Sequence, residues 1–425
     1  MGESEPSACR NACNAAFELP LVFGELFMRN LIRWFSRVAI VAVACLAQTM
    51  LVGVASAEEP AGFSKSLFDG VSLHGWSVEN DCEVDVIDGC IRLKSGEGWL
   101  RSHQAYRDFE LHVEWQALMP QGYDAGLYIR AAQEGKPGPK PSHQINLLQG
   151  KEGNIGDLPG AQSTGLAKPA GEWNAFDVRV VGDTVSLKIN GQPAYSVSGL
   201  KQPDGHLGFQ VEVPVGGQFL LKNIRITELG YRPLFNGRDL TGWQPVGDVA
   251  EACWSVAEGL LVCSGKKGPW LRSDAEFDDF NVRLEYRLST GGNSGMYVRV
   301  PLDGNHHRDN DTLPPAGFEV QILDDAAPGH LKLKDYQYSA SIYDIAGANP
   351  RVSRPVGEWN SLEINCRGQQ VTTWHNGHRV TNITAADSAL LGLRSTKGFL
   401  GLQNHNTVVK LRDIRLGPAV EVPAK

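Results

Sequence analysis

The stretch FELHVEW, residues 109–115, decides the fold class because its apolar and polar residues alternate strictly. Neighbouring side chains on a β-strand point to opposite faces, so this alternation predicts a strand with one face in a hydrophobic core. The stretch FNVRLEY at 280–286 has the same period. Asp-Gly and Asn-Gly pairs, as at 88–89 and 376–377, follow such runs and predict hairpin turns. Many short antiparallel strands with glycine-rich turns predict a β-sandwich or jelly roll.

The chain carries this pattern in two copies. LFDG at 67–70 returns as LFNG at 234–237, and GEWN at 171–174 returns at 357–360, in the same order. A period this long indicates a duplicated domain and not a solenoid. We therefore expect one domain at 58–230, a second at 231–418, and a short tail at 419–425.

Composition and charge agree with two globular domains. The 425 residues are 42% hydrophobic and 21% charged, which is typical of a folded chain that can bury two cores. The formal net charge is −8, and the basic residues are scattered. Binding to a phosphate backbone requires a basic stripe, so nucleic acid is not an expected partner.

Residues 1–57 are expected to be an upstream extension followed by a secretory signal peptide. Three arginines precede an uncharged stretch at 38–57, which ends in Ala-Ser-Ala. This order predicts a signal peptide from about Met28 to Ala57, and hence a secreted or periplasmic protein with no stable membrane insertion after cleavage. An uncleaved membrane anchor is the alternative, because the stretch is long enough to span a bilayer. A lipid anchor on Cys45 is a further alternative, although it leaves a short apolar region.

The five cysteines beyond this region are Cys82, Cys90, Cys253, Cys263 and Cys366. Their number is odd, and no two of them have the spacing of metal ligands. We expect small buried apolar residues, with one disulfide as the alternative in an exported protein.

Six stretches of the second copy carry a family resemblance, and the first copy keeps their frame over 67–229. They are PLFNGRDLTGW (233–243), DDFNVRLEYRLSTGGNSGMYVR (278–299), GFEVQILDD (317–325), PVGEWNSLEI (355–364), HNGHRV (375–380) and GFLGLQNHN (398–406). Jointly they resemble the 3-keto-disaccharide hydrolase domain, whose fold is similar to that of concanavalin A-like lectins and glucanases. The resemblance implies an all-β chain of two tandem concanavalin A-like jelly-roll β-sandwiches.

Strand parity separates core residues from open-face residues in the second copy. In FEVQI at 318–322 the apolar residues belong to the core, so Glu319 and Gln321 face the other way. The same reasoning places Arg299, Gln403 and His405 on an open face. We expect these five side chains to share one groove, with Asp324 near its rim at a strand end.

The chemistry that the resemblance implies uses a sugar whose C3 hydroxyl is already a ketone. The ketone makes the C2 proton acidic, so a base can remove it, the enolate can expel the C1 aglycone, and water can add to the enone. Our hypotheses are His405 or Glu319 as the base, Arg299 as the enolate stabiliser, and Asp324 or Glu319 as the acid. The expected substrate-binding residues are Gln321, Tyr343, Asn376 and Gln403, with Arg130, Gln144 and Glu212 in the first copy.

Each catalytic assignment has a purely structural alternative. Arg299 could form only a salt bridge with Glu319, and His405 could be an ordinary solvated histidine. Asp324 could serve only the turn that follows it.

The first copy differs at the polar positions. Gln144 stands in place of Glu319 and Glu212 in place of His405, whereas Arg130 matches Arg299. These changes remove most acid–base capacity and keep hydrogen-bonding groups, so we expect a binding or supporting domain. Glu212 leaves an altered activity open.

Three functions compete at this stage. The first is hydrolysis of 3-keto-glycosides by the second copy, downstream of a sugar oxidoreductase, with no cofactor. The second is a non-catalytic, lectin-like carbohydrate-binding protein. The third, an ordinary glucanase, is disfavoured because the pattern Glu-x-Asp-x-x-Glu on one strand is absent from the sequence. A divalent cation at residues 305–311 is an alternative to a solvated loop.

Overall fold

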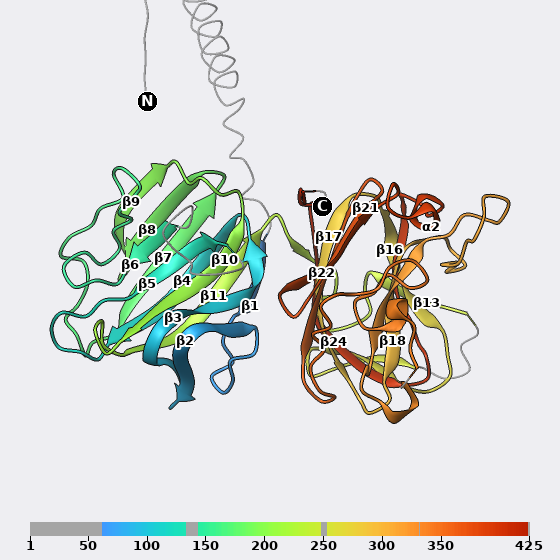
Figure 1. Cartoon of the computed structure of the whole chain (residues 1–425), viewed down its shortest axis with the longest axis horizontal. Coiled ribbons are helices and arrows are strands. Elements are labelled where there is room, and N and C mark those ends of the chain that lie inside the picture. The colour runs from blue at the N-terminus through green and yellow to red at the C-terminus, as the bar shows by residue number, and fades with distance from the viewer. Residues whose placement is uncertain (1–61, 133–142, 248–252, 331, 424–425) are drawn as a thin grey trace, which may run out of the picture. The chain divides into compact units, whose positions relative to one another are not determined.

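The computed structural model describes residues 62–132, 143–247, 253–330 and 332–423. Strands β1 to β11 form one β-sandwich and strands β12 to β24 form another (Figure 1). We call residues 62–229 the first sandwich and residues 232–417 the second sandwich. The predicted all-β fold of two jelly-roll sandwiches is confirmed.

The first sandwich contains eleven strands. They are β1 (Gly62–Ser66), β2 (Trp76–Ile87), β3 (Cys90–Tyr106), β4 (Phe109–Ala117), β5 (Gly126–Ala131), β6 (His143–Asn146), β7 (Asn174–Val181), β8 (Thr184–Ile189), β9 (Gln192–Ser198), β10 (Gly205–Val213) and β11 (Phe219–Leu229). Their order is β6-β5-β10-β3-β11-β4-β7-β8-β9, with β2 beside β3 and β1 beside β11. The 17-residue strand β3 pairs with β11 near its start and with β10 along its second half, so one curled sheet forms both layers.

The second sandwich repeats this order with its layers separated. Its strands are β12 (Arg232–Pro233), β13 (Trp243–Val246), β14 (Trp254–Ala257), β15 (Leu260–Ser264), β16 (Trp270–Phe277), β17 (Phe280–Leu288), β18 (Asn293–Val300), β19 (Phe318–Leu323), β20 (Asn360–Arg367), β21 (Gln370–His375), β22 (His378–Thr384), β23 (Gly398–Leu402) and β24 (Val408–Gly417). Short helices are η1 (Pro328–His330), η2 (Asp335–Gln337) and α2 (Ala389–Gly392). One sheet runs β14-β15-β24-β17-β20-β21-β22, with β12 beside β24, and the other runs β13-β16-β23-β18-β19. The non-strand residues 265–269 separate β15 from β16, where β3 is continuous in the first sandwich.

Burial along equivalent strands differs between the sandwiches. Strand β4 alternates buried and half-buried residues, as a strand with one core face should. Strand β17 is buried on both faces except at Arg287. The polar face of β17 is covered by the first sandwich, where Arg283 Nη1 meets Glu228 Oε2 at 2.6 Å and Glu285 Oε1 meets Lys65 Nζ at 2.7 Å.

The C-terminal tail, residues 418–423, is bound by side chains of the same sheet. Amide nitrogens of Asn365, Gln370 and Asn382 donate to the carbonyls of Val420, Val422 and Pro423, each at 3.0 Å. The tail thereby satisfies polar groups of β20, β21 and β22 that would otherwise need water.

The remaining expectations concern the N-terminal region, membrane-spanning helices and the cysteines. The predicted signal peptide and its cleavage site lie outside the described residues. Within the described ranges, no helix is both long enough and apolar enough to cross a membrane. Cys82, Cys90, Cys253, Cys263 and Cys366 are all free thiols, so the alternative of a disulfide is not met.

Candidate active site

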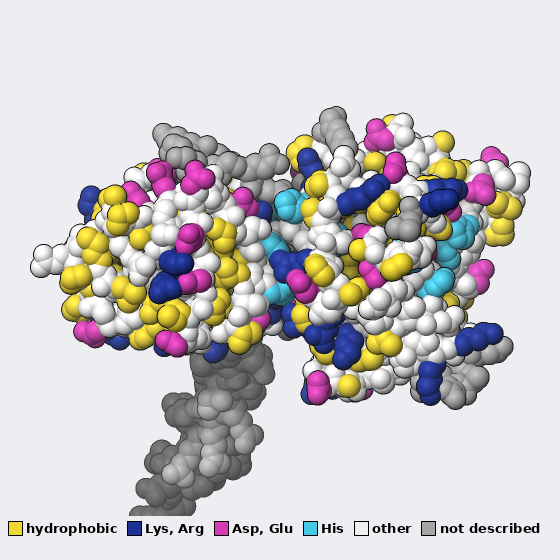
Figure 2. All heavy atoms as spheres, turned by 60° about the horizontal axis from the view of Figure 1, so that its bottom comes forward, with side chains coloured by type: hydrophobic (Ala, Val, Ile, Leu, Met, Phe, Trp, Pro, Cys, Tyr) yellow, Lys and Arg dark blue, Asp and Glu magenta, His cyan; other side chains and the backbone are white. Residues whose placement is uncertain are grey.

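The open face of β19 carries a polar pocket of about 300 Å³, which we call the β19 pocket. Its walls come from β18, β19 and the loops that surround them, and Figure 2 shows a group of histidine side chains on the surface of the second sandwich. The lining residues are Asn293, His306, His307, Glu319, Gln321, Leu323, His330, Leu333, Gln337, Tyr343, Gln403 and His405.

Glu319 is the buried acid of this pocket, with 4% of its surface exposed. Its side chain has room because the neighbouring strand carries Gly295, where a Cβ atom would stand 2.0 Å from Glu319 Oε1. Gln403 Nε2 donates to Glu319 Oε2 at 3.2 Å. Burial, followed by the charge of Asp344, raises the pKa of Glu319 to about 8, so the carboxyl group holds its proton at neutral pH.

His306 is the partner of this acid, with Nε2 3.5 Å from Glu319 Oε2. Its ring stacks on Tyr297 with 4.6 Å between ring centroids, and its Nδ1 lies 3.0 Å from the carbonyl of Gly304. A neutral imidazole that donates from Nδ1 to this carbonyl presents the lone pair of Nε2 to Glu319. Burial lowers the pKa of His306, and the nearby charge of Arg394 acts in the same direction.

Two further side-chain contacts hold residues in the wall of the β19 pocket. His307 Nδ1 pairs with Asp344 Oδ2 at 3.1 Å, and Gln337 Nε2 donates to the Tyr343 hydroxyl at 3.2 Å. The backbone N–H of Tyr343 donates to the carbonyl of Glu319 at 2.8 Å, which holds this segment against the edge of β19.

Two amide side chains have hydrogen-bonding capacity left over. Gln321 Oε1 accepts from the N–H of Ile322 at 3.1 Å, which leaves its NH₂ group for a ligand. Gln403 Oε1 is buried and has no partner among the described residues. Buried polar atoms without partners are rare in folded proteins, and bound molecules commonly satisfy them.

The structure brings five of the predicted site residues together in the β19 pocket: Glu319, Gln321, Tyr343, Gln403 and His405. Parity along β19 places Glu319 and Gln321 as expected. His405 reaches the pocket by another route, because β23 ends at Leu402 and His405 lies exposed in the following loop.

Arg299 does not share this pocket, so its expected position is wrong. Its residue is 2% exposed, and its guanidinium donates to the carbonyls of Asp278 and Gly368 at 2.8 and 2.6 Å. Arg299 has φ +53°, beside a register shift between Tyr297 and Val300. This irregularity breaks the parity on which its placement depended.

Two other predicted site residues, Asp324 and Asn376, are absent from the lining of the β19 pocket. Asp324 Oδ2 accepts from the N–H of Gly291 at 2.8 Å, and Asp324 lines a separate depression beside Asp325. Asn376, at φ +49° in the hairpin between β21 and β22, donates to the carbonyl of Val352 at 2.7 Å. Asp324 lies next to the pocket, since its backbone carbonyl is 2.7 Å from Nδ1 of the lining residue His330, but its carboxylate is bound to Gly291. Asn376 does not line the groove, which corrects its expected placement.

The first sandwich has a different set of groups at the matching positions. Gln144 donates to Gln210, and Gln210 Nε2 donates to Glu212 Oε2 at 3.1 Å. Burial and the charges of Asp124 and Glu97 raise the pKa of Glu212. Arg130, like Arg299, instead donates to backbone carbonyls, including that of Gly182 at 2.7 Å.

Sequence reasoning missed the catalytic potential of His306 and the pocket position of His307 and His330. All three lie outside strands, where alternation gives no direction. From the sequence, His306 and His307 belong only to the stretch 305–311, for which a divalent cation is the alternative to a solvated loop. No group of three or more His, Cys, Asp or Glu side chains that could hold a metal ion occurs among residues 62–132, 143–247, 253–330 and 332–423.

Fold and pocket together define a class of protein, namely a jelly-roll sandwich with a polar pocket in which a buried carboxyl group of one sheet meets a half-buried histidine of a neighbouring loop. The chain belongs to the 3-keto-alpha-glucoside-1,2-lyase-like domain family, which matches residues 63–227 and 230–417. The family predicted from the six motifs is confirmed.

Individual proteins are more distant. The 3-keto-disaccharide hydrolase of Bacteroides thetaiotaomicron is 28% identical over 225 residues, which cover 44% of this chain and 78% of that protein. A solved structure from Parabacteroides distasonis, provisionally assigned as a glycosyl hydrolase, is 25% identical with a TM-score of 0.36, and covers 44% of this chain and 98% of its own. The carbohydrate-binding module CBM66 from Bacillus subtilis is 15% identical with a TM-score of 0.30, and covers 36% of this chain and 94% of its own.

Proposed function

We propose that the second sandwich is an enzyme that cleaves the glycosidic bond of 3-keto-glycosides, such as 3-keto-disaccharides, by elimination and hydration in the β19 pocket. Support comes from the family and from the hydrolase name of the Bacteroides relative. The observation that carries the proposal is the 3.5 Å approach of His306 Nε2 to the Glu319 carboxyl group inside a polar pocket.

In the elimination step, the lone pair of His306 Nε2 takes the proton from C2 of the sugar. The C2–H electrons form an enolate with the C3 carbonyl, and then a C1–C2 double bond as the bond from C1 to the aglycone oxygen breaks. Protonated Glu319 gives its proton to that oxygen. Because the two groups are adjacent, they can serve C2 and the C1 substituent on the same face of the ring.

In the hydration step, the two groups exchange their duties. The Glu319 carboxylate takes a proton from water as the water oxygen bonds to C1, and the imidazolium of His306 returns a proton to C2. Both side chains regain their starting protonation states. The sum is hydrolysis of the glycosidic bond.

Neighbouring amides complete the site. The free NH₂ group of Gln321 is assigned to the developing enolate oxygen, the role first expected of Arg299. The unpartnered Oε1 of Gln403 accepts from a sugar hydroxyl, and exposed His405 contacts the substrate at the pocket mouth.

The first sandwich has a binding or supporting role in this proposal. Gln144 and Glu212 there replace the Glu319 and His405 of the second sandwich, so an equivalent acid–base pair is not formed by them. The substrate must come from a reaction that oxidises a C3 hydroxyl to a ketone, which is the work of a sugar oxidoreductase.

The proposal is tested by incubating the protein with a 3-keto-glucoside and, separately, with the unoxidised parent glucoside in deuterated water. We expect aglycone release from the keto sugar alone, with deuterium at C2 of the product to the extent that the imidazolium of His306 exchanges its proton with solvent before it returns one to C2. Release from both sugars, or release from neither, would overturn the proposal.

Glu319→Gln keeps the shape of the side chain and removes its proton chemistry. We expect turnover of the keto sugar to fall by about 10²–10⁴-fold, measured as aglycone release under saturating substrate. Glu276→Gln is the matched control, because Glu276 is an exposed acid of β16 that pairs only weakly with Lys397 at 3.9 Å. Equal rates for the two variants would rule Glu319 out as the acid.

A further inference from the structure

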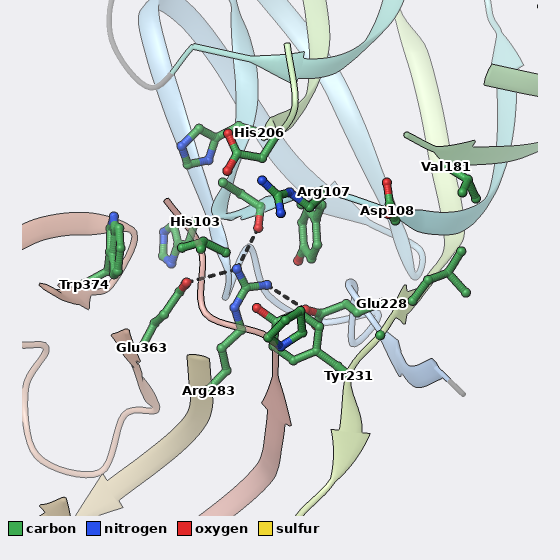
Figure 3. Close-up of a pocket in the computed structure, with 17 residues that line it drawn as sticks. His103, Arg107, Asp108, Val181, His206, Glu228, Tyr231, Arg283, Glu363 and Trp374 are labelled. Atoms are coloured by element: carbon green, nitrogen blue, oxygen red, sulfur yellow. Dashed lines mark hydrogen bonds and ion pairs between the residues drawn. The ribbon is translucent and has the colours of Figure 1, made fainter. Parts of the chain in front are cut away.

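A second cavity of about 260 Å³ lies between the two sandwiches, and we call it the inter-sandwich cavity. The end of β3 and the residues after β11 line it from the first sandwich, and β17, β20 and β21 line it from the second (Figure 3). Ligand pockets commonly measure about 300–1,000 Å³, so this cavity suits a molecule at the small end of that range.

The charges at its base are matched within the protein. Figure 3 shows Arg283 between Glu228 and Glu363, at 2.6 and 3.0 Å. Glu228 Oε1 also forms an ion pair with Arg415 Nη2 at 2.7 Å. Among the other lining residues, Arg107 and Asp204 carry opposite charges, and Asp108 pairs with Arg130 at 3.2 Å. A charged ligand would upset this balance at a desolvation cost, whereas a neutral polar ligand would not.

Two buried polar atoms in the wall lack partners. His103 is 6% exposed, and its Nδ1 has no hydrogen-bond partner among the described residues. Arg283 Nε is also buried and unpartnered. A buried polar atom costs free energy until a hydrogen bond satisfies it, which points to a bound molecule with hydroxyl groups.

Aromatic rings supply the apolar part of the wall. Half-buried Trp374 lines the cavity from β21, and Tyr106 lines it from β3. Figure 3 draws Trp374 and His103 among the residues that line the cavity. An indole face offers a large rigid surface on which the C–H face of a pyranose can pack, while its hydroxyls reach polar groups at the edge.

We propose that the inter-sandwich cavity is a second carbohydrate site, which binds a neutral monosaccharide of hexose size apart from the β19 pocket. Size, balanced charge, unpartnered polar atoms and the Trp374 surface together favour this ligand. The choice of a hexose over another polyol rests on the proposed function, whose substrate and product are sugars.

The test is calorimetric titration of D-glucose, D-glucuronate and D-glucosamine into the full protein carrying Glu319→Gln. This variant is used so that turnover does not contribute to the measured heat. We expect glucose to bind more tightly than either charged analogue. Trp374→Ala should weaken one class of glucose sites by about tenfold or more, and Tyr343→Ala should affect only the class in the β19 pocket.

Two further variants make the result decisive. Val181→Trp places a ring at an exposed position in the wall and should block the cavity without disturbing the core. Trp173→Ala removes a half-buried indole that lies under Lys222, away from the cavity, and should leave binding unchanged. Unchanged glucose binding in both Trp374→Ala and Val181→Trp, or tighter binding of a charged sugar, would overturn the proposal. Neither result depends on whether the keto sugar is hydrolysed.

Discussion

At the scale of a single residue, the burial of Glu319 lowers the stability of the folded protein and gives its carboxyl group a pKa suited to proton transfer. An ordinary carboxyl group ionises well below neutral pH, but burial and Asp344 keep this one protonated to about pH 8. A group whose pKa lies near the working pH can both give and take a proton, as the proposed reaction requires. Proteins commonly accept lower stability at such positions.

Unfolding should therefore become easier as the pH rises through this interval. The pKa of Glu319 is raised from 4.5 to about 8 on folding, so between these values unfolding releases a proton and the folded state loses stability with rising pH. Glu319→Gln does not titrate. We expect its melting temperature to match the wild type near pH 4 and to exceed it increasingly up to pH 8. Parallel melting curves at pH 4, 6 and 8 would contradict this account.

Single residues also show how far the sequence determines the site. Glu319 and Gln321 could be placed by parity, because β19 is regular and its apolar residues occupy the core. Arg299 and Arg130 could not, because both have φ near +50° at irregular positions. Left-handed conformations of non-glycine residues are uncommon and leave no clear sign in the residue type.

At the scale of elements, the loop at residues 301–317 carries the histidine half of the acid–base pair. Arg308 holds this loop in shape, donating to the carbonyls of Leu313 and Asp311 at 3.0 Å. It also donates to the carbonyl of Leu393 at 3.0 Å, beyond the end of α2. Three backbone contacts from one guanidinium make Arg308 a positioning residue for His306.

Arg308→Ala should loosen the loop without disturbing the core. We expect kcat for the keto sugar to fall by about tenfold, since small displacements of a reacting group are costly, with a smaller change in KM and little change in melting temperature. Steady-state kinetics would show the split. Lys397→Ala removes an exposed cation of the same sandwich and is the control. Equal kinetics for the two variants would argue against the role of Arg308.

Strands were predictable from the sequence, whereas the loops over the β19 pocket were not. Alternation identified β4 and β17, and the Asn-Gly pair at 376–377 marked the hairpin between β21 and β22. His306, His330 and Tyr343 lie in connecting segments whose course depends on tertiary hydrogen bonds. His405 was assigned to an extended strand, although β23 ends at Leu402.

At the scale of the whole molecule, a buried carboxylate joins the two sandwiches. Glu228 is 2% exposed and contacts both Arg283 and Arg415. Burial alone would raise the pKa of Glu228, but the two arginines outweigh burial and lower it. The carboxylate is thus ionised across the physiological range, and the face of β17 that it covers is no free surface.

Glu228→Ala should be strongly destabilising, because it leaves two buried guanidinium groups without their counter-charge. We expect a loss of about 3–5 kcal/mol in the free energy of unfolding, measured by denaturant titration. Glu83→Ala removes an exposed acid that pairs with Lys94 at 2.9 Å, and should change the stability little, because water screens such a surface pair. Equal losses would show that Glu228 contributes no more than a surface pair.

Export of this molecule remains a proposal that rests on the sequence of residues 28–57. An exported hydrolase would meet its substrate outside the cytoplasm. Mass spectrometry of the protein recovered from the cell envelope and medium should give an N-terminus near Glu58. A mature protein that begins upstream of Met28 would contradict it.

The C-terminal tail has a practical consequence for choosing a cloning boundary. The family match ends at residue 417, directly before the segment whose carbonyls accept from Asn365, Gln370 and Asn382. A gene fragment trimmed to that limit would encode all strands of the described residues and would still lack the segment that binds these three amide side chains. Poor solubility of such a fragment would then result from where the fragment ends, and it would not indicate a defect of the fold.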